Sequence, residues 1–281
     1  MTTILVTMPP TTGSDDRLTF EHAEVVGKDF SGRRLDYLGV TGSRFERCRF
    51  ERMRVREAAL GLRVEQSEYI DCSFDRSRMT LHSGGYARFV RCSFRDVILR
   101  EWDCYHVELV DCVFTGTLRQ VRFWTRTPAE WRHIDYESYV RWSLKEGRGQ
   151  PPDSVRELML RADNEFHGND FSGADLIKVD FRGGIDLSAQ RLPSGDGYLY
   201  VPNAPDAIDR ALALVDKRVP PELAADVVRF LRDVLGREVE QGQHQLLLRD
   251  TDFASRKVVP PDIVAAFDLL RQVGAAPTGP S

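Results

Sequence analysis

The sequence predicts a mainly β solenoid, in which the chain winds repeatedly round one axis, and three observations support this. Four strings of one pattern recur, RFERCRF (44–50), EYIDCSF (68–74), RFVRCSF (88–94) and ELVDCVF (108–114). Cys72, Cys92 and Cys112 follow one another at a constant step, and the step from Cys48 to Cys72 is four positions longer. A shorter period of five positions lies inside the longer one. A fixed internal repeat is typical of stacked architectures.

The period of five sets the shape of each turn. Apolar residues recur every five positions from Phe20 to Leu60 and then, after a slip of one position, from Val64 to Met79. An α-helix has a period of 3.6 and a strand a period of two, so neither explains this pattern. A coil with four sides of five residues does, because four such sides return the chain to its starting side and account for the constant step of the cysteines. Neighbouring turns would lie roughly 4.8 Å apart, the spacing of paired strands.

The repeat also identifies the residues that should point into the coil. The predicted core is Cys48, Phe50, Cys72, Phe74, Cys92, Phe94, Cys112, Phe114, Phe171, Leu176 and Phe181. Each turn offers a single thiol, whereas a metal site needs several ligands to converge. We therefore expect the cysteines to pack as small apolar side chains and to hold no metal. Free thiols suit a reducing compartment.

The most regular stretch, NDFSGADLIKVDF (169–181), indicates a family. Its inward positions would be Phe171, Leu176 and Phe181, with Asn169, Ala174 and Val179 two positions earlier. This pattern resembles the pentapeptide-repeat proteins, whose consensus is A(D/N)LXX. The resemblance covers residues 20–124 and 164–187 and implies a right-handed quadrilateral β-helix. The chain departs from the consensus in its cysteines and in the slip near Leu60.

Changes in the pattern divide the chain into five predicted segments. They are an N-terminal lead-in or cap (1–19), the repeat β-helix (20–124), a helical insertion (125–163), a final β-helix coil (164–190) and a mostly helical C-terminal domain (191–281). Pro128 followed by Glu130 is typical of a helix start. The glycines of SGG (83–85) fall where an inward residue is due, so we expect a loosened corner there.

The C-terminal segment has a different pattern. Apolar residues at helical spacing predict three amphipathic helices, around 208–215, 223–234 and 263–270. A short hairpin is expected between the last two, within 236–248. This domain could cap the exposed strand edges of the coil, form a homodimer or bind the partner, and the sequence leaves these three roles open.

No motif in the sequence predicts catalysis or a cofactor. The six histidines are scattered, and His106 is predicted to lie on the coil surface. The net charge is −4 and no apolar run is long enough to span a membrane, so we expect a cytoplasmic protein. These features favour a non-enzymatic protein.

Charge on the coil suggests where a partner would bind. Residues 28–126 hold 19 Lys and Arg against 14 Asp and Glu, a net charge of +5. We predict a rigid scaffold that binds an unidentified protein partner. The candidate interaction surface is Arg47, Arg49, Arg52, Arg54, Arg56, Trp131 and Trp142.

Two other functions are compatible with the repeat. Some pentapeptide-repeat proteins mimic duplex DNA and bind DNA gyrase, but that activity needs an acidic coil and this one is basic. Arginines alternate with aromatic residues across 119–148, which would suit phosphate contact and base stacking in a nucleic-acid-binding protein. The sequence pI of 5.9 argues against that interpretation.

Overall fold

The structure is a computed structural model and describes residues 16–62, 64–82, 85–195 and 197–274. The chain divides into two compact units. The first extends to Val179 and includes Ala189–Leu192, whereas the second comprises Asp180–Ser188 and the chain from Pro193 onward.

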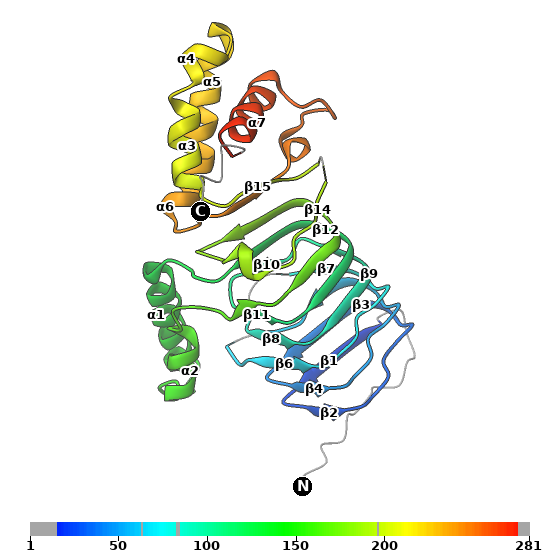
Figure 1. The fold of residues 1–281 in the computed structure, drawn as a ribbon. Helices are drawn as coiled ribbons and strands as arrows, with labels where there is room; N and C mark the ends of the chain where they lie inside the picture. Colours follow the sequence, from blue (N-terminus) through cyan, green and yellow to red (C-terminus); the bar gives the residue numbers. More distant parts are fainter. Residues whose placement is uncertain (1–15, 63, 83–84, 196, 275–281) are drawn as a thin grey trace, which may run out of the picture. The chain divides into compact units, whose positions relative to one another are not determined.

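The first unit is a β-solenoid of about five turns, built from parallel strands (Figure 1). Sheet A has the order β1-β3-β5-β7-β9-β12-β10, and β14 also pairs with β12. Its strands are β1 (Arg17–Glu21), β3 (Arg34–Thr41), β5 (Arg54–Ala59), β7 (Arg78–Leu81), β9 (Ser93–Arg100), β10 (Asp103–Cys104), β12 (Val113–Trp124) and β14 (Asp170–Arg182).

A second sheet, sheet B, forms another wall of the solenoid, with the order β13-β11-β8-β6-β4-β2. Its strands are β2 (Glu24–Val26), β4 (Arg44–Glu46), β6 (Ser67–Ile70), β8 (Ala87–Val90), β11 (Val107–Val110) and β13 (Phe166–His167).

Strand register confirms the steps predicted from the sequence. Leu35 pairs with Val55, Val55 with Met79 and Met79 with Leu99, so the middle step is four positions longer than the other two. The extra residues of this longer step lie between the end of β5 and the start of β6. Val64, predicted to point inward, is instead partly exposed in this connection. That prediction was wrong because Val64 lies in a turn between the two strands instead of in a wall.

Stacked aromatic rings run up the interior. Ring centroids are 5.0 Å apart for Phe50 and Phe74, and 4.8 Å apart for each later pair up to Phe171. Every residue of the predicted core is at most 6% exposed. Each cysteine thiol of the column donates a hydrogen bond to a carbonyl of the preceding turn, as Cys92 does to Tyr69 at 3.2 Å. The thiols therefore fill space beside the rings and also link adjacent turns.

Left-handed backbone recurs at regular intervals along the solenoid. Positive φ angles occur at Gly27, Gly32 and Gly42 and continue at Arg47 and Arg52, at intervals of five or ten residues. The position missing from this series, residue 37, lies within β3, where the chain continues as one long strand.

Two glycines are required by close backbone approach. Gly116 has φ +91°, and a Cβ there would lie 2.3 Å from the carbonyl oxygen of Val97, at the register shift between β9 and β12. A Cβ on Gly85 would lie 1.7 Å from the carbonyl oxygen of Gly61. The predicted loosened corner at 83–85 otherwise falls on residues 83 and 84, outside the described residues.

Two helices interrupt the solenoid, α1 (Ala129–Lys145) and α2 (Asp153–Met159). A helix does start here, but Pro128 is the N-cap residue of α1 and the first helical residue is Ala129. Figure 1 shows both helices beside the strands β8 and β11. Glu108 of β11 anchors this segment, because it accepts from Arg161, just beyond α2, at 2.9 Å.

The second unit has a separate apolar core. Its helices are α3 (Ala204–Leu212), α4 (Val215–Arg218), α5 (Pro221–Arg229), a π-helical segment (Phe230–Leu235), α6 (Gly236–Glu240) and α7 (Pro261–Gly274). Short 3-10 helices lie at Leu187–Ala189 and Asp250–Phe253. Helix α5, the π segment and α6 follow one another directly, so apolar residues predicted as one helix at 223–234 lie in α5 and the π segment.

A two-stranded antiparallel sheet completes the second unit. It pairs β15 (Leu199–Val201) with β16 (Leu246–Leu248). The hairpin predicted within 236–248 was therefore wrong, because residues 236–240 are helical and the LLL strand pairs with β15, far earlier in the chain. Fully buried Gln243 accepts from the backbone N–H of Ile185 at 2.9 Å and holds residues 184–185 within the unit. No helix among the described residues is both long and apolar enough to cross a bilayer.

Candidate interaction surface

Outward charges alternate in sign along sheet B. Glu24, Arg44, Glu68, Arg88 and Glu108 are neighbours in register on successive strands. Arg44 pairs with Glu68, and Arg88 binds Glu108 at 3.4 Å and Glu165. Opposite charges on adjacent strands attract one another, so the positive and negative side chains of this column compensate each other.

Sheet A has the opposite arrangement. Arg34 lies in register with Arg54, and Arg54 lies in register with Arg78. These three guanidinium groups come from consecutive strands, whose backbones are roughly 4.8 Å apart. Like charges directly opposite each other destabilise a sheet. Sheet A therefore carries a column of like charges that repel one another, whereas the charges in the column on sheet B attract one another.

A second set of arginines lies beside this column. Arg56 follows Arg54 by two residues, so its side chain emerges on the same face of β5. Arg100 of β9 is in register with Arg119 of β12. We refer to Arg34, Arg54, Arg56, Arg78, Arg100 and Arg119 together as the arginine face; all six are exposed.

Five of these arginines line one groove. It has a volume of about 640 Å³ and extends across β3, β5, β7 and β9. Its remaining lining residues are Asp16, Leu35, Asp36, Val55, Met79, Thr80 and Ile98. Both carboxylates come from the first turns, and Leu35, Val55 and Met79 are strand residues whose side chains are buried inside the solenoid. The groove is thus basic over most of its length and acidic at one end.

Within the described part of the chain, no member of the arginine face forms an ion pair. The basic residues predicted just before β5 behave differently, because nearby carboxylates neutralise them. Arg49 lies 3.2 Å from Glu51 and 3.6 Å from Asp29, and Arg52 is 3.9 Å from Glu51. Arg47 pairs with Glu46. Hydrogen bonding from Arg49 holds the pKa of the Glu51 carboxyl below its usual value.

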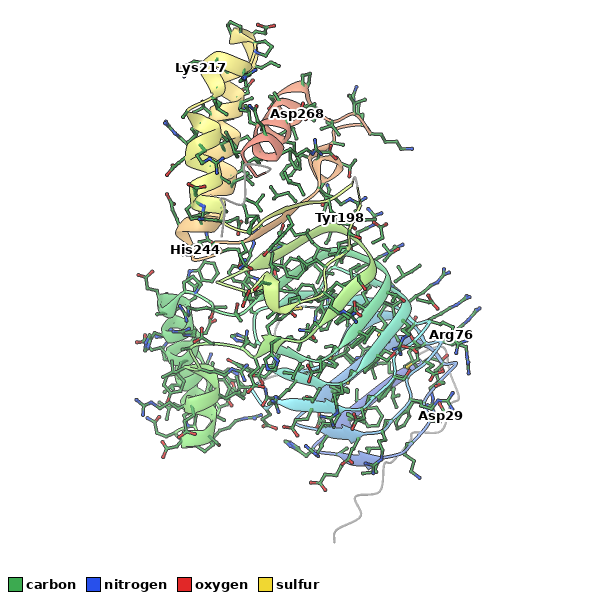
Figure 2. All side chains as sticks on the ribbon, viewed as in Figure 1. Asp29, Arg76, Tyr198, Lys217, His244 and Asp268 are labelled. Atoms are coloured by element: carbon green, nitrogen blue, oxygen red, sulfur yellow. The ribbon has the colours of Figure 1, made fainter. Side chains whose placement is uncertain are left out.

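Figure 2 shows Asp29 and Arg76 projecting outward from the solenoid, at the edge of this paired network. Arg76 reaches Glu51 at 3.4 Å. Of the five arginines predicted from sequence, the structure therefore places only Arg54 and Arg56 on the uncompensated face. The prediction therefore grouped arginines that differ in their surroundings: some have carboxylate partners, and Arg54 and Arg56 do not.

The two predicted tryptophans lie elsewhere, on α1. Trp131 is 48% exposed and its ring is 6.3 Å from that of Tyr105. Trp142 is 41% exposed and carries the guanidinium of Arg148 at 4.8 Å from its ring centroid. No residue of α1 lines the groove. The structure therefore does not bring the predicted arginines and tryptophans into one surface.

Three side chains of the alternating arginine and aromatic pattern pair with other residues of this chain. Trp124 is buried and donates from its indole N–H to Asp103 at 3.2 Å, and Arg122 binds the same carboxylate at 3.1 Å. Arg126 pairs with Asp163 at 2.7 Å. At these positions the side chains of the alternating pattern have partners within the protein: Arg122 and Trp124 meet Asp103 in the solenoid, and Arg126 meets Asp163 at the end of the insertion.

His106 does not lie openly on the surface as predicted. Its ring stacks on Tyr86 at 4.2 Å, and it is partly buried. Burial lowers the pKa of His106 to about 4, with a smaller contribution from the positive charge of Arg161. Burial likewise raises the pKa of the Cys92 thiol. No group of three or more His, Cys, Asp or Glu residues that could hold a metal ion occurs in the described ranges.

Three groove residues were missed by the sequence analysis: Arg34, Arg78 and Arg100. The sequence repeat contained a signal for two of these residues, Arg34 and Arg78. The regular step separates Arg34 from Arg54, and the longer step separates Arg54 from Arg78, so the same steps relate these arginines and the core positions. Applying the repeat to outward charges as well as to inward residues would have revealed the column.

The like-charge column leads to a prediction about stability. Arg54→Thr should leave the free energy of unfolding unchanged or raise it by about 0.2–1 kcal/mol at low salt, because it removes repulsion from both neighbouring turns. Added salt should reduce the gain, since it screens exposed charges. Arg91→Thr is the matched comparison and should be slightly destabilising, since Arg91 donates to both oxygens of Asp71 at 2.7 and 2.9 Å. Denaturant unfolding at two salt concentrations measures both; a clear loss of stability in Arg54→Thr would assign that side chain a structural role.

Comparison with known proteins does not identify a family. No protein-family model matches the chain, and no curated protein matches it either.

Proposed function

We propose that this protein is a non-enzymatic scaffold of the pentapeptide-repeat type, and that its arginine face binds a protein partner with an acidic surface. The solenoid supplies a rigid wall, because every turn is hydrogen-bonded to the next and the rings inside are in contact. The arginine face supplies the recognition chemistry. Five guanidinium groups open into one groove, each able to donate several hydrogen bonds to carboxylates.

The observation that carries this proposal is the contrast between the sheets. Both stack charged residues at the same spacing, yet sheet B alternates their sign and sheet A does not. A structural role alone would favour alternation on both faces. An anionic partner explains the exception, because it would supply the negative charges that the arginine column lacks.

Assignment to the pentapeptide-repeat type is part of the proposal. Positive φ angles at intervals of five support a four-sided turn, as does the stacking of one phenylalanine per turn. Asn169 supports it further, because its side chain accepts from the N–H of Cys112 at 3.0 Å and donates to Leu109 at 2.9 Å, linking one turn to the next. Right-handed winding, a helical C-terminal domain and a cytoplasmic location belong to the same proposal.

The two alternatives fit the charges less well. A DNA mimic that binds gyrase would need a continuous acidic face, whereas the outward column of sheet A is basic and that of sheet B alternates. A protein that binds single-stranded nucleic acid would combine cations with exposed aromatic platforms. No aromatic residue is among those that line the groove.

Quantitative capture from cell extract tests the proposal. The full chain is compared with Arg54→Glu/Arg78→Glu, which reverses the centre of the arginine column. We expect at least one acidic protein bound by the wild type to be lost from this variant. Arg218→Glu/Arg232→Glu is the control, because it changes the net charge equally at two exposed sites of the second unit. An unchanged set of bound proteins in both variants would contradict the proposal, and loss of nucleic acid instead would favour the nucleic-acid alternative.

A further inference from the structure

We infer that the groove of the arginine face recognises an extended acidic peptide segment, which lies along the stacking direction of the turns and contacts at least three of them. This inference rests on the proposed function and specifies the partner's chemistry. The ligand is a run of carboxylates in one chain. The alternatives to be excluded are a folded acidic surface and a nucleic acid.

The direction of the bound segment follows from the direction of the groove. Its basic lining comes from four strands of sheet A, one from each of four successive turns. Arg34, Arg54 and Arg78 lie directly over one another, so the positive charge is distributed from turn to turn. An anion placed across the strands can contact several of these arginines, whereas one placed along a strand meets only the pair Arg54 and Arg56.

The length of the groove excludes a small anion as the full ligand. From the turn of Arg34 to the turn of Arg100 there are three steps, roughly 14 Å at the spacing of paired strands. A single carboxylate or phosphate would engage two neighbouring guanidinium groups and leave the others unpaired. An extended peptide advances about 3.3 Å per residue, so about five residues cover the same distance. Acidic residues in such a segment would place a carboxylate near each turn.

The two ends of the groove differ in charge. Asp16 and Asp36 line the end formed by the first turns, and within the described residues neither carboxylate has an ion-pair partner. They would repel an acidic chain and limit how far it extends in that direction. At the opposite end, Arg100 is in register with Arg119, which continues the positive charge beyond the groove. The bound segment should therefore be centred on Arg54, Arg78 and Arg100.

The neutral part of the lining favours a peptide over a nucleic acid. It comprises Leu35, Val55 and Met79, whose side chains are buried inside the solenoid, and the outward residues Thr80 and Ile98. The methyl groups of Thr80 and Ile98 can pack against the methylene groups of glutamate. Stacking of bases would need aromatic rings, which the lining of the groove does not include.

Fluorescence anisotropy with defined peptides tests the inference on the purified full-length protein. The probes are labelled oligoglutamates of roughly three, six and nine residues, measured at low salt. We expect affinity to rise at least tenfold from three to six residues, as the peptide comes to span the turns, and to change little from six to nine. Arg54→Glu/Arg78→Glu should weaken binding of the six-residue probe at least tenfold, and Arg218→Glu/Arg232→Glu should have less than a twofold effect.

Each contrary outcome points to a specific error. Affinity that keeps rising in proportion to length, or that falls equally in both variants, would indicate binding to general positive charge and would overturn the inference. Tighter binding of an equally charged DNA oligonucleotide, lost in Arg54→Glu/Arg78→Glu, would replace the peptide with a nucleic acid. If oligoglutamate fails to bind while capture of an acidic protein still depends on Arg54 and Arg78, the proposed function stands and the extended segment is wrong.

Discussion

Phe94→Ala is expected to destabilise the protein by about 3–5 kcal/mol, the usual cost of truncating a buried phenylalanine. Phe94 is 1% exposed and lies between Phe74 and Phe114, with ring centroids 4.8 Å from each. Alanine would leave a cavity between two turns and remove both stacking contacts, each worth about 0.5–1.5 kcal/mol. Denaturant unfolding followed by tryptophan fluorescence measures the loss, since Trp102 lies 6.5 Å from the Phe94 ring.

The neighbouring residue provides the control. Arg95 is exposed, and its side chain donates to Ser93 at 2.8 Å. Arg95→Ala should change stability by no more than about 0.5 kcal/mol, as is usual for surface positions. Adjacent positions on one strand point to opposite sides, so this pair compares the interior with the surface at the same turn. Equal effects of the two substitutions would contradict the assignment of Phe94 to the core.

The solenoid could be predicted because its period is carried by the largest side chains. The longer step relates Phe50 to Phe74 and the regular step relates Phe74 to Phe94, and the same residues stack in the structure. The error at Val64 has a physical cause. A lengthened step shows that residues have been added to one turn, but an apolar residue among them can lie either in a strand or in a connecting loop. Which of the two it does depends on the pairing between strands, and the local sequence pattern contains no information about that pairing.

The candidate site was only partly predictable for a related reason. Arg54 and Arg49 are both outward arginines of the same turn, and nothing in their local sequence separates them. Their difference arises from the neighbouring turn, where Arg49 meets Asp29 at 3.6 Å and Arg54 meets Arg34 and Arg78. The net charge of a face therefore depends on which residues the strand register places next to one another on neighbouring turns. His106 illustrates the same limit, because its burial depends on Tyr86, which lies one turn away.

Glu108→Ala is expected to destabilise the protein by about 3 kcal/mol, close to the lower end of the range for breaking a buried ion pair. Glu108 is 5% exposed, and its carboxylate accepts from Arg161 at 2.9 Å and from Gln66 at 2.8 Å. It is also 3.4 Å from Arg88. The lower value is expected because both arginines are partly exposed, so water can replace some of the lost interactions, and Arg88 keeps its pairing with Glu165.

A local effect should accompany the loss of global stability. Arg161 follows α2 and is held to β11 through Glu108, so its release should loosen the segment that joins α2 to the next turn. Limited trypsin digestion should then cut faster after Arg156 and Arg161 in Glu108→Ala than in the wild type. Glu24→Ala is the control, because Glu24 occupies the same column of sheet B but is exposed and forms no ion pair within the described residues. Unchanged digestion at these two sites would show that the carboxylate stabilises β11 alone and does not fasten the helical insertion to the solenoid.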